Sequence, residues 1–151
     1  MNETSKLDII LLAEDDSDDR LLLKDALADC GWGGELRCVE DGEELLDYLL
    51  HRGKYESPAD APRPGLVLLD LNMPRMDGQQ ALREIRADAS LRSIPVVVLT
   101  TSKADTDVAK LYDLGANSFV SKPVQFDTFV NVIRVLGQYW FKTVTLPALK
   151  P

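Results

Sequence analysis

The sequence predicts an α/β fold, a doubly wound sheet of five parallel strands with helices on both faces. Three observations support this fold class. Segments with the pattern of a strand alternate five times with segments of helical periodicity. The first, third and fourth strand segments are apolar along their whole length, which is typical of parallel strands covered on both faces. The chain has 151 residues, enough for one ordinary domain with its own core.

The first half of the chain holds two strand–helix pairs and a loop. Residues 7–13 are apolar and predict a strand that ends at acidic residues. Residues 16–31 predict a helix, because serine and aspartate side chains cap its start, apolar residues recur at helical spacing and a glycine follows. Residues 35–40 alternate like a strand, and residues 42–53 predict a short helix. Residues 53–65 are rich in proline and predict a loop.

The second half of the chain continues the same alternation. Residues 66–70 and 94–100 predict two buried strands, and residues 117–121 predict a short fifth strand. Residues 77–88 and 103–115 predict the helices between these strands.

The predicted last helix, residues 125–140, has two apolar faces, whereas a helix that covers a sheet needs only one. One face holds Phe126, Phe129, Val130, Ile133 and Trp140, and the other holds Val132, Val135 and Tyr139. The second face is either a partner surface or is covered by the tail that follows, and both hold if the tail completes a dimer interface. We therefore expect an N-terminal tail (1–6), a folded domain (7–140) and a C-terminal tail (141–151).

Composition limits the function classes. The formal net charge is −8, so most of the surface repels a phosphate backbone, and we expect no direct binding to nucleic acid. No apolar stretch is long enough to span a bilayer, and the polar N-terminus has no signal-peptide core, so we expect no membrane partner. The two cysteines do not form a disulfide framework. Together these features predict a cytoplasmic protein.

Polar side chains stand at the ends of four predicted strands. Glu14 and Asp15 follow the first strand, and Asp70 ends the third. Thr100 ends the fourth strand, and Lys122 follows the fifth. Because an open parallel sheet binds ligands beyond the carboxyl ends of its strands, we expect these five side chains to converge on one edge.

Three carboxylates in one pocket repel each other unless a cation joins them. Mg²⁺ prefers oxygen ligands, so it is the cofactor that we expect here. Asp15 and Asp70 would bind it directly and Glu14 through water, with a backbone carbonyl near Asn72 as a further ligand. The neighbouring acids are expected only to cap the following helix: Asp16, Asp18 and Asp19.

A carboxylate beside Mg²⁺ can act as a nucleophile toward a phosphoryl group. The metal ion, the Lys122 ammonium and the Thr100 hydroxyl would each neutralise one phosphoryl oxygen. The residues at the sheet edge therefore predict phosphorylation of Asp70.

Four motifs taken together, AEDD, LLDLNMPRMDG, VVVLTTS and FVSKP, resemble the receiver domain of bacterial two-component response regulators. The resemblance covers nearly the whole chain. It implies a flavodoxin-like (βα)5 receiver fold with strand order 2-1-3-4-5. It also implies an aspartyl phosphate on Asp70, a requirement for Mg²⁺, and phosphoryl transfer from a sensor histidine kinase.

The resemblance further implies a conformational switch. The switch hydroxyl falls on Thr100, and the aromatic switch falls on Phe119, where many members have tyrosine. Thr101 stands where many receivers have a smaller residue. The family's lysine–proline bond is usually cis, which here would be the bond between Lys122 and Pro123. Phosphorylation is expected to change the surface formed by the fourth helix, fifth strand and fifth helix.

The loop before the third strand, the LTTS motif and the YWFKTVTLP tail resemble a subgroup, the single-domain regulators of phytochrome-type histidine kinases. That resemblance implies a light-sensing kinase as partner and a homodimer built from the last helix. Because no effector domain follows, output is expected to go through a downstream protein or a histidine phosphotransfer partner. Such a switch assists its own phosphorylation and dephosphorylation but is not an enzyme with a separate substrate.

The same residues argue against two other functions. A pseudo-receiver binds partners without phosphorylation, and loss of Asp70, Lys122 or an acid would be its signature, yet all are present. A phosphohydrolase with an aspartate nucleophile typically carries a second acid two residues later, where this chain has Asn72.

Overall fold

The computed structural model describes residues 9–100, 105–123 and 125–147, and its strands form one parallel sheet in the order β2-β1-β3-β4-β5. The predicted fold class and strand order are therefore confirmed. The strands are β1 (Ile9–Ala13), β2 (Glu35–Val39), β3 (Leu66–Leu69), β4 (Val96–Thr100) and β5 (Ser118–Ser121). The helices are α1 (Ser17–Asp29), α2 (Gly42–Leu50), α3 (Gly78–Ala87), α4 (Asp105–Leu114) and α5 (Phe126–Gly137). Two 3-10 turns, η1 (Gly53–Tyr55) and η2 (Pro58–Asp60), lie in the predicted proline-rich loop, and a π-helix, η3 (Gln138–Thr143), follows α5.

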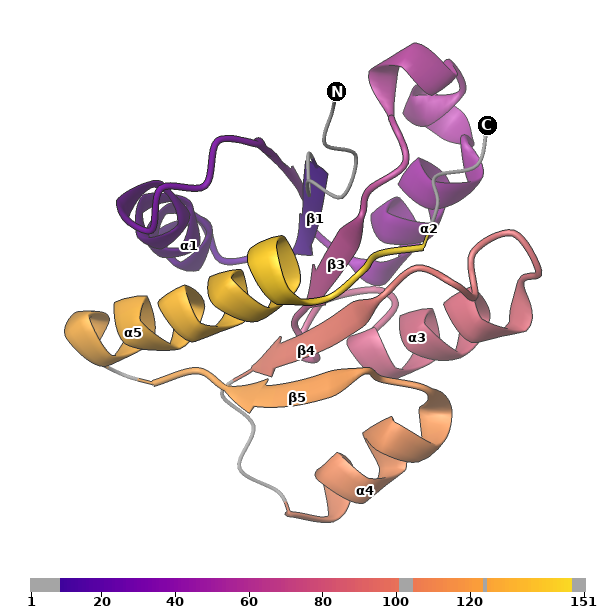
Figure 1. Cartoon of the computed structure of the whole chain (residues 1–151). Helices are drawn as coiled ribbons and strands as arrows, with labels where there is room; N and C mark the ends of the chain where they lie inside the picture. The colour runs from indigo at the N-terminus through magenta and orange to yellow at the C-terminus, as the bar shows by residue number, and fades with distance from the viewer. Residues whose placement is uncertain (1–8, 101–104, 124, 148–151) are drawn as a thin grey trace.

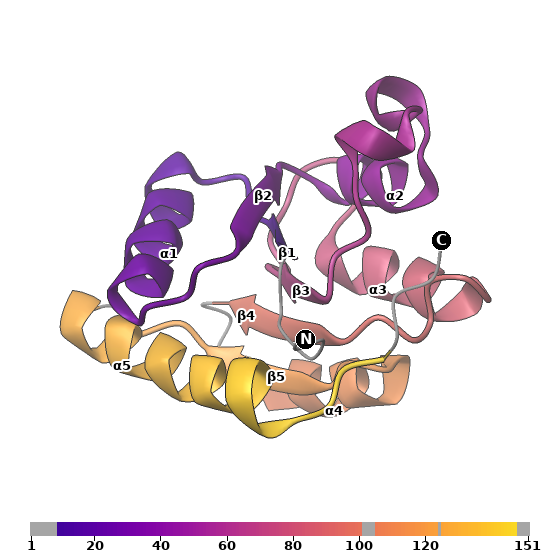
Figure 2. The same ribbon diagram turned by 45° about the horizontal axis from the view of Figure 1, so that its top comes forward.

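The helices form two layers around the sheet (Figures 1 and 2). The helices α1 and α5 pack against each other on one face, whereas α2, α3 and α4 cover the other face. Within the described residues, no helix is both long and apolar enough to cross a bilayer.

Alternate residues of the buried strands belong to two separate cores. Leu11 of β1 lies opposite Val67 of β3, and both join the cluster beneath α2, α3 and α4. Their neighbours Leu12 and Leu68 are also opposite each other, and both join the cluster beneath α1 and α5. Side chains of a strand alternate between the two faces of the sheet, so a sheet covered on both faces needs apolar residues at every position. This explains the unbroken apolar runs in the sequence.

One arginine holds together the loops at the amino ends of β4 and β5. Arg86, in the last turn of α3, donates from Nε to the carbonyl of Gly115 (2.7 Å). Its Nη1 donates to the carbonyls of Arg92 (3.0 Å) and Ile94 (2.9 Å), and its Nη2 to Oδ1 of Asn117 (2.8 Å). The guanidinium therefore joins α3 to the segments that lead into the last two strands.

The strand β5 lies at one edge of the sheet, next to α4 (Figure 1). A side chain of α4 reaches the backbone of this edge strand, because the Phe119 N–H donates to the hydroxyl of Tyr112 (3.1 Å). The Phe119 side chain is half-buried and packs against the core beneath α2, α3 and α4.

The C-terminal region differs in part from the expected helix and tail. The helical winding does not end at Trp140 but continues through the π-helix to Thr143, and two tail residues, Val144 and Leu146, pack against the core beneath α1 and α5. Phe129, Val130, Ile133 and Trp140 are buried as predicted. The prediction is wrong for Phe126, which is 47% exposed because it lies in the first turn of α5, at the end of the helix pair.

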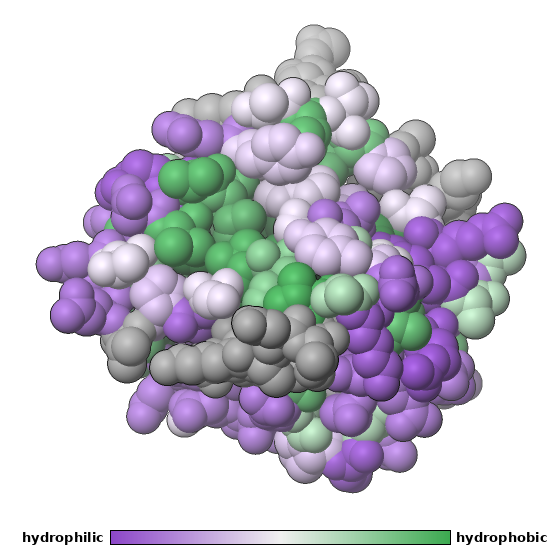
Figure 3. Space-filling model, turned by 90° about the horizontal axis from the view of Figure 1, so that it is seen from below, coloured by the Kyte–Doolittle hydropathy of each residue, from purple (hydrophilic) through white to green (hydrophobic). Residues whose placement is uncertain are grey.

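The second apolar face of the last helix stays open. Val135 is 58% exposed and Tyr139 is 48% exposed, although the packed part of the tail lies close by. Figure 3 views the molecule from below, on the side of α4 and β5, and shows apolar side chains gathered in one area of this face with hydrophilic residues around it. The tail up to Pro147 therefore does not cover the exposed face of α5.

Candidate functional site

The carboxyl ends of β1 and β3 bring two acids together. The Glu14 N–H donates to the carbonyl of Val39 (2.9 Å), and the Asp70 N–H donates to the carbonyl of Ala13 (3.0 Å). These bonds extend the pairing of the sheet by one residue beyond each strand. As a result, the first residue after each strand is fixed at the same edge of the sheet.

Three carboxylates form a cluster at this edge. One oxygen each from Glu14, Asp15 and Asp70 lies within 4.8 Å of the other two. Glu14 is 3% exposed and Asp70 is 6% exposed, whereas Asp15 is exposed. The cluster is thus buried on the side of the sheet and open to solvent at Asp15.

Lys122 contacts the cluster from the end of β5. Its Nζ donates to Oε1 of Glu14 (2.7 Å) and to Oδ2 of Asp19 (2.9 Å). Burial would lower the pKa of Lys122, but the hydrogen bonds and the attraction of Glu14, Asp19 and Asp70 outweigh it, so the pKa is raised. The lysine is therefore a fixed positive charge beside the carboxylates.

Burial makes the charged form of Glu14 unfavourable. Burial raises the pKa of Glu14 from 4.5 to about 7; the contact with Lys122 opposes this shift, whereas the charge of Asp70 adds to it. Its second oxygen, Oε2, accepts from the Asp16 N–H (3.2 Å). One ammonium group is thus too little positive charge to keep this buried acid at its ordinary pKa.

This donor set fits a hard divalent cation. The cluster offers oxygen atoms only, carries more negative than positive charge, and opens to solvent at Asp15. Mg²⁺ and similar ions prefer oxygen ligands and keep several waters, which an open side permits. Asn72, whose carbonyl was expected to add a ligand, is exposed in the loop that follows Asp70.

The loop after Asp70 is fastened to the start of α2. The backbone of Arg75 has a φ of 62°, and its guanidinium pairs with the buried carboxylate of Asp41. The Gly42 N–H donates to the carbonyl of Met76 (2.9 Å). The helix α3 begins close to the site, because a Cβ at Gly78 would lie 2.6 Å from the carbonyl oxygen of Asp70. The sequence alone assigned no role to Asp41 or Arg75.

The two expected switch residues are placed at the other side of the site. The backbone of Thr100 lies opposite Ser121 in the β4–β5 register, next to Lys122. Phe119 lies opposite Val98, two residues before the end of that ladder. The side chain of Thr100 and the whole of Thr101 lie outside the described residues.

Two details at Lys122 differ from expectation. The part of the chain that the structure describes contains no cis peptide bond, and it includes both Lys122 and Pro123, so the implied cis bond is not found. Asp16 does cap α1, because its side chain accepts from the N–H groups of Asp18 and Asp19. The side chain of Asp19, however, binds Lys122. A negative residue in the first turn of a helix is common for electrostatic reasons, so the sequence held no signal for this contact.

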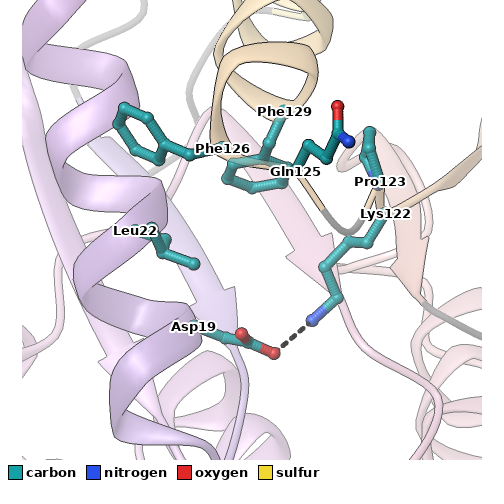
Figure 4. Close-up of a pocket in the computed structure, with 7 residues that line it drawn as sticks. All are labelled: Asp19, Leu22, Lys122, Pro123, Gln125, Phe126 and Phe129. Atoms are coloured by element: carbon teal, nitrogen blue, oxygen red, sulfur yellow. Dashed lines mark hydrogen bonds and ion pairs between the residues drawn. The ribbon is translucent and has the colours of Figure 1, made fainter.

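A cavity of about 190 Å³ adjoins the ion pair between Asp19 and Lys122. In Figure 4 the apolar lining comes from α1 and from the start of α5, and the Asp19–Lys122 contact lies at one side of it. The lining consists of Asp19, Leu22, Lys122, Pro123, Gln125, Phe126 and Phe129.

Comparison with known proteins places this site in a family. Residues 10–134 match the model of the response regulator receiver domain. The chain is 37% identical to the response regulator Rcp1 of Synechocystis sp. over 147 residues, which cover 97% of this chain and 98% of Rcp1. Two solved structures are also similar. The phosphorylated cyanobacterial phytochrome response regulator RcpA has 39% identity and a TM-score of 0.87, covering 94% of this chain and 99% of RcpA. The Mn²⁺-bound form of Rcp1 has 38% identity and a TM-score of 0.86, covering 93% and 99%. The chain therefore belongs to the family of response regulator receiver domains.

Proposed function

We propose that this protein is a signalling switch that accepts a phosphoryl group on Asp70 with the help of Mg²⁺. The observation that carries the proposal is the convergence of Glu14, Asp15, Asp70 and Lys122 at one edge of the sheet. RcpA in its phosphorylated form and Rcp1 with bound Mn²⁺ have the same fold, which supports both parts of the proposal.

Each residue of the site has a chemical role in this reaction. A carboxylate oxygen of Asp70 attacks the phosphorus atom, and the bond from phosphorus to the donor atom breaks, leaving an acyl phosphate on Asp70. The carboxylates of Glu14, Asp15 and Asp70, with the Asn72 carbonyl, would hold Mg²⁺, which supplies positive charge to the transferring oxygens. Lys122 supplies a second positive charge, and the Thr100 hydroxyl would complete the set of donors.

The proposed phosphodonor is a sensor histidine kinase of the phytochrome type. RcpA is a cyanobacterial phytochrome response regulator and is similar to this chain over nearly the full length of both. In the transfer, the nitrogen–phosphorus bond of a phosphohistidine breaks and the histidine keeps the electron pair. The protein would act in the cytoplasm and pass the signal to a downstream protein or a histidine phosphotransfer partner.

The proposed output surface comprises α4, β5 and α5, and its apolar part would bind a second copy of the chain. Tyr112 (49%), Val135 (58%) and Tyr139 (48%) are exposed on α4, on α5 and just after α5, and apolar side chains gather on this side of the molecule (Figure 3). Thr100 and Phe119 connect the site to this surface, because they lie on β4 and β5. Added charge at Asp70 would bias the arrangement of these elements.

Intact mass spectrometry after incubation with acetyl phosphate tests the phosphorylation. We expect one added phosphoryl group in the presence of Mg²⁺ and none with a chelator. Asp70→Asn should abolish the addition, whereas Asp25→Asn, a change at an exposed acid of α1, should leave it intact. Labelling that persists in Asp70→Asn would contradict the assignment of the acceptor. An absence of labelling, both from acetyl phosphate and from a phytochrome-type kinase, would favour a binding module that works without phosphorylation.

Sedimentation velocity tests the dimer. Removing residues 141–151 would also break the π-helix and strip Val144 and Leu146 from the core, so a point substitution is a cleaner probe. Val135→Glu introduces a better helix former and would place an unpaired charge in an apolar interface. We expect this variant to sediment as a monomer at concentrations where the unaltered protein dimerises. Identical profiles would remove Val135 from the interface.

A further inference from the structure

The ammonium of Lys122 is already engaged before any phosphoryl group arrives. A lysine ammonium has three N–H donors, and here Glu14 and Asp19 each accept one. Neither is the proposed acceptor residue. Glu14 itself lies in the carboxylate cluster with Asp70, so the lysine is held within reach of the reacting group but directed elsewhere.

The two partners of Lys122 differ in how firmly they are held. The side chain of Glu14 is 4% exposed, and its other oxygen is bound by the Asp16 N–H. The side chain of Asp19 is 36% exposed and lies on the surface of α1 beside a cavity (Figure 4). If the lysine leaves Asp19, that carboxylate returns to water at low cost, whereas leaving Glu14 would strand a buried charge.

We propose that Asp19 is a positioning residue that competes with the phosphoryl group for Lys122. This inference rests on the proposed function of Asp70. A phosphoryl group on Asp70 brings close to two negative charges and strong acceptor oxygens into the cluster. Lys122 then exchanges Asp19 for a phosphoryl oxygen while it keeps Glu14. Asp19 thereby lowers the affinity of the site for a phosphoryl group and sets how readily the switch is turned on.

Binding of beryllium trifluoride, which mimics a phosphoryl group on aspartate, tests the competition. Calorimetric titration at saturating Mg²⁺ would compare the unaltered protein with Asp19→Asn, which keeps the shape of the side chain and removes its charge. An ion pair with one exposed partner contributes roughly 0.2–1 kcal/mol, so we expect Asp19→Asn to bind the analogue about 1.4- to fivefold more tightly. Asp19→Glu should restore an affinity close to that of the unaltered protein.

Asp18→Asn is a matched control. Asp18 lies in the same first turn of α1 and its loss changes the net charge equally, but within the described residues its side chain makes no ion pair, and its backbone N–H donates to Asp16. We expect this variant to bind the analogue like the unaltered protein. In a Lys122→Gln background, Asp19→Asn should no longer change the affinity, because the group for which Asp19 competes is gone.

The outcomes separate this inference from the proposed function. If the unaltered protein neither binds the analogue nor becomes phosphorylated, both proposals fail. If the unaltered protein binds the analogue, the competition is refuted when Asp19→Asn binds it no more tightly than the unaltered protein does. It is also refuted when Asp19→Asn binds the analogue no more tightly than Asp18→Asn does. In both cases the phosphorylation of Asp70 stands. A gain that persists in the Lys122→Gln background would show a general charge effect and would also overturn the inference.

Discussion

Replacing Arg86 by methionine should destabilise the fold without disabling the site. Arg86 donates four hydrogen bonds, two of them to the part-buried carbonyls of Gly115 and Ile94. A hydrogen bond to a charged group contributes about 1.5 kcal/mol at the low end of its range, and the two exposed bonds contribute little. Burial lowers the pKa of Arg86, which shows that desolvation offsets part of the gain. Counting only the two part-buried bonds gives a loss of about 3 kcal/mol.

Urea unfolding followed by circular dichroism measures this loss directly. The midpoint should fall while the slope stays constant, because the variant changes stability and not the surface exposed on unfolding. For a chain of this size the melting temperature should fall by about 6–12 °C. Arg83→Met is the matched control, because Arg83 lies on the same helix and is exposed.

A loss below about 1 kcal/mol, or one equal to that of Arg83→Met, would show that water replaces the guanidinium at these carbonyls. Because Arg86 lies at the amino ends of β4 and β5, away from Asp70, the folded variant should still accept phosphate from acetyl phosphate. Loss of labelling in the folded variant would mean that the two edges of the sheet are coupled.

Three further predictions concern the site and its surface. Gly78→Ala should lower the free energy of unfolding, measured in urea, by about 1–3 kcal/mol and should slow labelling by acetyl phosphate, because the added Cβ would lie 2.6 Å from the Asp70 carbonyl oxygen. Unchanged stability and an unchanged labelling rate would contradict this prediction. Without divalent cations, the unaltered protein should lose stability relative to Glu14→Gln as pH rises from about 5 to about 8, by up to about 3 kcal/mol. The reason is that the pKa of Glu14 is about 7 in the folded state and 4.5 in the unfolded state, so at higher pH the folded state must bury a charged Glu14. A difference that stays constant with pH in the same unfolding experiment would refute that pKa. Tyr112→Phe should speed hydrogen exchange at the Phe119 amide, measured by NMR, because its hydrogen-bond acceptor is lost; equal protection would show that the contact is not formed in solution.

Much of the fold could be predicted because each buried strand is covered on both sides. Leu11 and Leu12 serve different cores, so both must be apolar, and the resulting run identifies a parallel strand. The strand ends then place Glu14 and Asp70 at one edge without knowledge of any contact. Those positions follow from topology alone, which is why sequence reasoning reached them.

The remaining details depend on side-chain direction, which no periodicity encodes. Asp19 has the sequence context of a helix-capping acid, yet it binds Lys122, more than one hundred positions away in the chain. Phe126 has the spacing of a core residue, yet it is 47% exposed and lines the cavity beside Asp19 and Lys122. Arg75 has a φ of 62°, a left-handed conformation that its residue type does not favour.

The contact between Tyr112 and Phe119 has a consequence for how the output surface would change. Edge strands present unpaired backbone groups that can template the addition of a foreign strand. Here the Phe119 N–H of the edge strand β5 donates a hydrogen bond to the Tyr112 hydroxyl of α4. Any displacement of α4 from β5 that breaks this bond therefore uncovers a backbone donor of the edge strand. A partner that supplies an extended peptide would then pair with this N–H only when α4 has moved away from β5.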